Sequence, residues 1–295
     1  MYGFNTRFKC FLTILLVAVS CNTPVLAASQ IDSTDWVPDN VFTQGVEGPV
    51  ADSNGNLYAV NYKQQGTIGV VAPNGEHALF VTLPEGSIGN GLRFNSNGQL
   101  LVADYNSHNV LVIDMQTKAI SVLVHNVNMN QPNDIAISPN DVVYASDPNW
   151  ADNTGQLWMI KPSGQSVLVE SDVGTTNGIE VSPSGKVLYV NESVQRKVWR
   201  YDINAEGLPV NKSLFYQFDD HGLDGMRTDS KGNLFIARHG AGEIAVLSPT
   251  GALIKTYHLK GEFPTNVAFG GEHKNVLYIT MQKRGAIERI VLSVQ

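Results

Sequence analysis

The sequence contains only two cysteines, at positions 10 and 21, and both lie within its first 27 residues. The remaining chain therefore cannot be stabilised by disulfides or bind a metal through thiolates. There is no block of Lys or Arg and the net charge is -7, which argues against a nucleic-acid partner. The apolar run over residues 11–20 is too short to span a bilayer.

The N-terminus has the pattern of a secretory signal peptide. Arg7 and Lys9 precede the apolar run, and the small residues Val25 and Ala27 stand at a cleavage site. We therefore expect a signal peptide over residues 1–27, a folded domain over residues 28–295, and a secreted or periplasmic protein without membrane attachment after cleavage. A lipid anchor on Cys21 is the alternative.

An internal repeat fills most of the remaining chain. Six segments contain an alternating apolar run, a polar turn and a second β-rich run, and the repeat spacing is about 42–47 residues, as in propeller blades. In most repeats a third strand closes with Pro-x-Gly and a fourth apolar run follows, as at residues 155–164 and 167–169. This pattern predicts an all-β fold, a six-bladed β-propeller with four-stranded blades. The absence of a Trp-Asp dipeptide excludes the WD40 class.

The sixth repeat ends near Leu292 without a fourth strand. The segment from Trp36 to Thr43 precedes the first repeat and has no hairpin partner there. We expect this N-terminal segment to supply the missing strand of the sixth blade, which would close the ring and leave no free sheet edge. A β-sandwich or an open array of repeats is the alternative fold.

Every repeat carries an oxygen-bearing side chain at the same position, eight residues before the end of the hairpin turn. These first-tier residues are Glu47, Asn90, Asn133, Asn177, Asp224 and Asn266. Because the first strand of a blade lines the channel, six such side chains converge on one axis. Hard oxygen donors without Cys or His favour Ca²⁺, with Zn²⁺, Mg²⁺ or Mn²⁺ as alternatives. Asn and Asp are also common at strand ends and in turns, so a purely structural role for these residues is the alternative to a metal site.

A second position recurs six residues after the turn and faces the first across each hairpin. These second-tier residues are Asn61, Asp104, Asp147, Asn191, Arg238 and Thr280. Arg238 is a candidate to bind an anionic substrate group or an oxyanion. Pairing with a carboxylate such as Asp224 is the alternative. His221, His239 and Tyr105 lie near the same face.

Several short segments together resemble the senescence-marker-protein (regucalcin), gluconolactonase and luciferin-regenerating-enzyme family. They are Glu47-Gly48-Pro49, Pro132-Asn133-Asp134, Asn177-Gly178-Ile179, Leu223-Asp224-Gly225-Met226 and Thr265-Asn266-Val267. The resemblance spans residues 45–290. It implies a six-bladed propeller with a divalent cation, often Ca²⁺, on Glu47, Asn133, Asn177 and Asp224. Thr176, where the family commonly has Pro, and Arg238-His239 depart from its pattern.

The resemblance implies hydrolysis of a lactone or similar ester, whose carbonyl the cation would polarise for attack by water. Asp224 is the first candidate to deprotonate that water, and Asp147 and Asp104 are alternatives. The candidates for substrate binding are Asn133, Arg238, Asp104 and Asn90. We expect a monomer with a small-molecule substrate. A phosphotriesterase and a non-catalytic secreted scaffold with structural Ca²⁺ are the rival functions.

Overall fold

Every regular element of the structure is a β-strand. The computed structural model describes residues 1–3 and 30–292, and within them no helix long and apolar enough to cross a membrane occurs. The strands form six antiparallel sheets of four strands each. The predicted six-bladed β-propeller is confirmed. The predicted signal peptide falls almost entirely on residues 4–27, outside the described residues.

The first three blades follow one another along the chain. Blade one contains β2 (Val50–Ala51), β3 (Leu57–Val60), β4 (Thr67–Val71) and β5 (His77–Thr82). Blade two contains β6 (Gly89–Phe94), β7 (Leu100–Asp104), β8 (Asn109–Ile113) and β9 (Ile120–His125). Blade three contains β10 (Ile135–Ile137), β11 (Val143–Asn149), β12 (Thr154–Ile160) and β13 (Ser166–Gly174).

The other three blades have the same order of strands. Blade four contains β14 (Thr176–Val181), β15 (Val187–Glu192), β16 (Lys197–Ile203) and β17 (Pro209–Gln217). Blade five contains β18 (Met226–Thr228), β19 (Leu234–Arg238), β20 (Glu243–Leu247) and β21 (Leu253–His258). Blade six contains β22 (Pro264–Gly270), β23 (Val276–Met281), β24 (Ala286–Val291) and β1 (Thr34–Val37).

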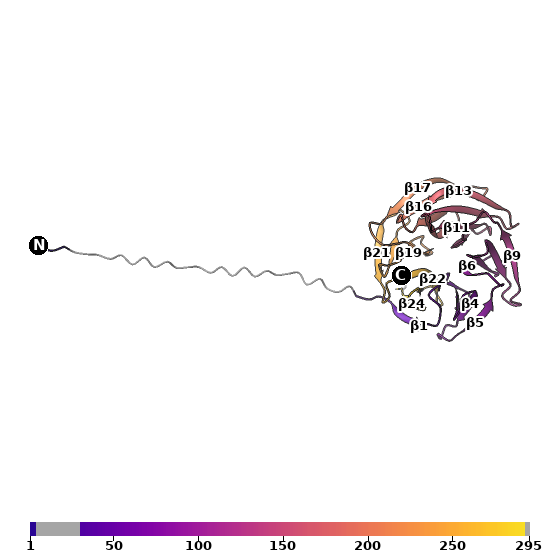
Figure 1. The fold of residues 1–295 in the computed structure, drawn as a ribbon, viewed down its shortest axis with the longest axis horizontal. Helices are drawn as coiled ribbons and strands as arrows, with labels where there is room; N and C mark the ends of the chain where they lie inside the picture. The colour runs from indigo at the N-terminus through magenta and orange to yellow at the C-terminus, as the bar shows by residue number, and fades with distance from the viewer. Residues whose placement is uncertain (4–29, 293–295) are drawn as a thin grey trace. The chain divides into compact units, whose positions relative to one another are not determined.

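The hydrophobic core is divided among the six interfaces between blades, which follow one another around the ring in Figure 1. Between blades one and two, for example, Val60 packs with Leu92 and Leu100. A middle strand is covered on both faces, so β3 and β7 are buried along their whole length. Burial of both faces explains why these strands read as continuous apolar runs.

The N-terminal strand closes the ring as predicted. β1 pairs antiparallel with β24, and the two strands lie side by side in Figure 1. The strand covers Thr34–Val37 rather than the predicted segment from Trp36 to Thr43. Pro38 has no N–H to donate and therefore ends the strand, and Asn40 turns the chain with a φ of 66°. Phe42 then forms an isolated bridge with Tyr62 of blade one.

A buried carboxylate holds this closure. Glu288 of β24 is fully buried and accepts hydrogen bonds from Ser33 Oγ at 2.5 Å and from Arg284 Nη1 at 2.5 Å. The backbone N–H groups of Lys260 and Gly261 donate to it at 3.1 and 2.9 Å. Glu288 thus joins the N-terminal segment to the loop between blades five and six.

We predict that Glu288→Ala destabilises the protein by about 1–3 kcal/mol, because it removes the buried acceptor of the Ser33 and Arg284 hydrogen bonds and leaves the Gly261 N–H without a partner. The free energy of unfolding in urea measures this loss. The matched control is Asp202→Ala, which breaks the exposed ion pair with Arg200 and should barely change stability. Equal effects of the two substitutions would show that Glu288 does not hold the ring closed.

Candidate functional site

Five of the six first-tier residues line one cavity of about 400 Å³ at the loops that lead into the innermost strands. They are Glu47, Asn90, Asn133, Asn177 and Asp224. The propeller brings them together because each stands just before, or at the start of, the first strand of its blade. A larger open depression near Asn56 and His77 lies along β4 and β5 and contains none of these residues.

Two carboxyl groups meet in this cavity. The Glu47 and Asp224 carboxyl groups lie beside each other, with the Asn177 side chain against Asp224 and the Asn266 side chain against Glu47. Burial, followed by the negative charge of Asp134, raises the pKa of Glu47 to about 7. Burial, followed by the charge of Glu47, raises the pKa of Asp224 well above its ordinary value. Two buried acids placed together in this way strongly favour a shared positive charge.

Side-chain amide oxygens complete a set of possible metal ligands that contains oxygen atoms only. Asn133 is buried, and its Oδ1 has no hydrogen-bond partner in the structure. Such an oxygen normally costs stability unless a ligand or water satisfies it. Together with the Glu47–Asp224 pair, it fits a hard divalent cation. No group of three or more His, Cys, Asp or Glu side chains suitable for a metal occurs among residues 1–3 and 30–292, so amide oxygens have to provide part of the set.

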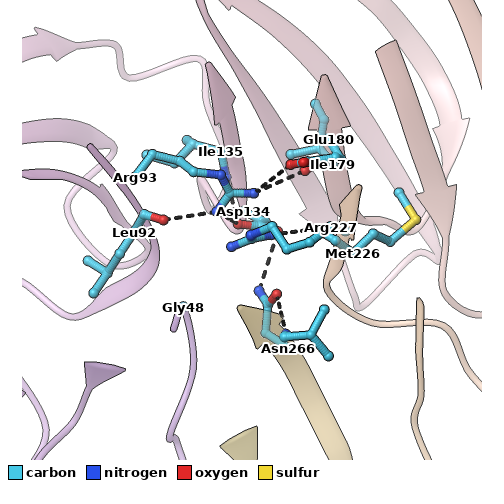
Figure 2. A network of polar contacts seen from close by, with 12 residues as sticks. Gly48, Leu92, Arg93, Asp134, Ile135, Ile179, Glu180, Met226, Arg227 and Asn266 are labelled. Atoms are coloured by element: carbon cyan, nitrogen blue, oxygen red, sulfur yellow. Dashed lines mark hydrogen bonds and ion pairs between the residues drawn. The ribbon is translucent and has the colours of Figure 1, made fainter. Parts of the chain in front are cut away.

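A network of charges lies beside these residues (Figure 2). Asp134 is almost fully buried, and its two carboxylate oxygens each lie 3.3 Å from a guanidinium, those of Arg93 and Arg227. Arg93 also pairs with Glu180 at 3.3 Å. Burial, followed by the repulsion of Arg227, lowers the pKa of Arg93 to about 10. Two arginines thus balance two carboxylates, and this network was not predicted from the sequence.

Asn266, the sixth first-tier residue, belongs to this network and is not among the residues that line the cavity. Its Nδ2 donates to Asp134 at 3.3 Å, and its Oδ1 accepts from the N–H of Val267 at 2.9 Å. Its amide therefore has partners in this network, and its side chain also lies against Glu47, so Asn266 borders the set of four that the resemblance implies.

The second-tier residues hold loops and do not line the cavity, with the exception of Asn61. Asp147 is fully buried, and its carboxylate accepts from the N–H groups of Asn130 at 2.9 Å and Gln131 at 2.6 Å. Burial raises its pKa. Asp104 likewise accepts from Ser87 Oγ at 2.7 Å. Both predicted bases thus fix the loops that lead to first-tier residues.

Arg238 has its partner outside the cavity. Its Nη2 donates to the backbone oxygen and to Oδ1 of Asp220, both at 2.6 Å, and its guanidinium lies 3.9 Å from the centre of the Phe218 ring. The pairing with a carboxylate that the sequence left open is therefore observed, although with Asp220 rather than Asp224. The structure does not bring Arg238 to the predicted substrate-binding position.

The rest of the cavity wall is neutral and partly aromatic. It contains Tyr105 and His239, which sequence analysis placed near this face, and residues that it missed: Gln44, Gln65, Trp150, Ser193 and Gln282. His239 Nε2 lies 2.9 Å from Gln282 Oε1. Tyr105 and Trp150 each follow a second-tier residue within a few positions. This spacing is the signal in the sequence that could have indicated them as cavity residues.

Comparisons with known proteins identify relatives of this chain. The family model described as "SMP-30/Gluconolactonase/LRE-like region" matches residues 46–283. A gluconolactonase of Zymomonas mobilis is 27% identical over 272 residues, 80% of this chain and 76% of its own. A diisopropyl-fluorophosphatase of Loligo vulgaris is 25% identical over 276 residues, 82% of this chain and 87% of its own.

Among solved structures, a protein described as a calcium-binding regucalcin from Agrobacterium tumefaciens superposes with a TM-score of 0.78 at 20% identity. The match covers 90% of this chain and 96% of that one. At this identity it supports the propeller fold alone.

We predict that, with a chelator present, the free energy of unfolding decreases as pH rises from about 4.5 to about 7. In this range folded Glu47 keeps a proton that the unfolded chain releases, so the folded state binds more protons and loses stability with rising pH. The Tm should fall by several degrees more in wild type than in Glu47→Gln, which cannot release this proton. Identical pH slopes for the two proteins would contradict the raised pKa.

Proposed function

Because this chain belongs to the SMP-30/gluconolactonase/LRE-like family, we propose that it hydrolyses lactones, with a divalent cation held by Glu47, Asn133, Asn177 and Asp224. The observation that carries the proposal is the convergence of these four side chains, from four blades, on one cavity. Their charge of -2 when both carboxyls ionise matches a divalent cation, and their oxygen donors suit Ca²⁺.

When bound, the cation would act as a Lewis acid that polarises the lactone carbonyl and lowers the cost of the developing oxyanion. We assign to Asp224 the orientation of the attacking water and the acceptance of its proton, because its carboxyl both belongs to the proposed oxygen set and lines the cavity. Asn133 and Asn177 bring neutral oxygens, which keep the total charge of the set at -2. Asn90 lines the same wall and donates to the backbone oxygen of Asn133 at 3.0 Å.

This arrangement favours Asp224 over Asp147 as the base. Asp147 is fully buried, and the N–H groups of Asn130, Gln131 and Trp158 donate to its carboxylate. We therefore assign Asp147 to the support of the loop before Asn133. We further propose that the protein acts as a monomer and is exported after cleavage near Ala27.

A phosphotriesterase is the second candidate, favoured by the likeness to the diisopropyl-fluorophosphatase of Loligo vulgaris over 82% of this chain. The same oxygen set would then serve a P=O group in place of a carbonyl. Assays with a lactone panel and with diisopropyl fluorophosphate side by side separate the two reactions. A protein that hydrolyses neither would favour the scaffold with structural calcium.

We predict that Asp224→Ala lowers kcat/KM for glucono-δ-lactone by about 10²–10⁴-fold at saturating calcium, because it removes a ligand and the base together. Glu47→Gln should instead raise the calcium concentration needed for activity. Asn266→Ala, a first-tier change outside the set of four, is the control and should be milder. A pH-stat assay across a calcium titration measures all three. Near-normal turnover by Asp224→Ala would refute this mechanism.

We also predict a preference for uncharged lactones. No Lys or Arg is among the described residues that line the cavity, and the Arg238 guanidinium is held by Asp220. A 6-phosphorylated gluconolactone should therefore show a kcat/KM at least about tenfold below that of glucono-δ-lactone, a loss of about 1.4 kcal/mol in transition-state binding. The 6-O-methyl lactone separates size from charge and should react faster than the phosphorylated one. Equal rates for the neutral and phosphorylated lactones would contradict this prediction.

A further inference from the structure

Asn191, at the end of β15, uses both ends of its amide to join two blades. It is fully buried. Its Oδ1 accepts a hydrogen bond from the N–H of Gly178 at 3.1 Å, and its Nδ2 donates to the backbone oxygen of Asp224 at 2.6 Å. Gly178 follows Asn177 directly. One side chain therefore links the backbone beside one proposed ligand to the backbone of another.

The contact between these two backbone segments is very close. A Cβ atom added at Gly178 would lie 2.3 Å from the backbone oxygen of Asp224 and 2.7 Å from Asn191 Nδ2. No residue with a side chain fits there without moving Asp224. The N–H of Asp224 donates to the oxygen of Ala237 at 2.9 Å, within blade five, so Asn191 adds the constraint from blade four.

Asn191 differs in this from the other second-tier side chains. The side chains of Asp104, Asp147 and Arg238 bond to loops or strands of their own blades. Asn61 and Thr280 do the same through Gly45 and Asn266. Of the six, Asn191 is the one whose side chain reaches a first-tier residue of the neighbouring blade.

We propose that Asn191 is a positioning residue of the cation site, which sets the separation of Asn177 and Asp224 through their backbones. The inference rests on the proposed function. The cation needs the oxygens of both blades at bonding distance at once, and residues that orient ligands typically change metal affinity 10–100-fold when replaced. Loss of the two Asn191 hydrogen bonds should let blades four and five move apart and weaken cation binding, while the first-tier side chains themselves are unchanged.

The test is calcium binding by isothermal titration calorimetry to chelator-treated protein, with calcium alone and no substrate. Asn191→Leu keeps the volume of the side chain and removes both hydrogen bonds, and its Kd for calcium should rise about 10–100-fold. Thr280→Val is the matched control, because it also removes fully buried second-tier hydrogen bonds, but ones to Thr265 and Asn266, outside the ligand set. Its Kd should stay within about twofold of wild type.

Thermal unfolding without calcium separates this role from a general loss of stability. Both variants should lose Tm to a similar extent, whereas only Asn191→Leu loses affinity. Should Asn191→Leu not fold, Asn191→Ser carries the same expectation. Unchanged affinity in the folded Asn191 variant, or equal weakening in Thr280→Val, overturns the positioning role alone. A wild-type chain that binds no divalent cation overturns the proposed cation site as well.

Discussion

The burial of carboxylates at the centre of the ring is the constraint on which the site depends. Ionised acids removed from water require a positive charge nearby or they become protonated. Asp134 and Glu180 have Arg93 and Arg227 beside them. Glu47 and Asp224 form no ion pair with any Lys or Arg of the described ranges 1–3 and 30–292, and their raised pKa values reflect this. Because the two arginines already balance the charges of Asp134 and Glu180, Glu47 and Asp224 are the acids whose charge favours a bound cation.

The first-tier and second-tier residues have different roles in meeting this constraint. First-tier side chains are brought to one cavity, while second-tier side chains bind the backbone of the loops that carry them, as Asp147 does for residues 130 and 131. Glycine follows the first-tier residue in four blades, at positions 48, 91, 178 and 225, because the neighbouring blade approaches there too closely for a side chain. These hydrogen bonds and close contacts hold the loops that carry the proposed ligands.

The cavity wall suits the proposed lactone, a substrate rich in hydroxyl groups, better than it would suit a charged substrate. Amide side chains such as Gln44 and Gln65 both donate and accept hydrogen bonds, as hydroxyl groups require. Trp150 and Tyr105 add apolar surface with a polar edge. The charges of the site are thereby confined to the two carboxyls that belong to the oxygen set. In the proposed function, the substrate and the cation would therefore bind in different parts of one cavity.

The sequence by itself determined the fold and the first tier. Six in-phase repeats predicted the blades, the missing last strand predicted closure by the N-terminus, and a fixed register singled out Glu47 and its equivalents, because each of these features is local in the chain. Contacts between blades have no local signal, so the pairing of Arg93 and Arg227 with Asp134 was not predicted. The register also could not tell whether a second-tier side chain points to the cavity or to its own loop. Only the tertiary structure decided that Arg238 pairs with Asp220 within its own blade and that Asn191 reaches Asp224 of the neighbouring blade, since each pair lies on segments separated in the sequence.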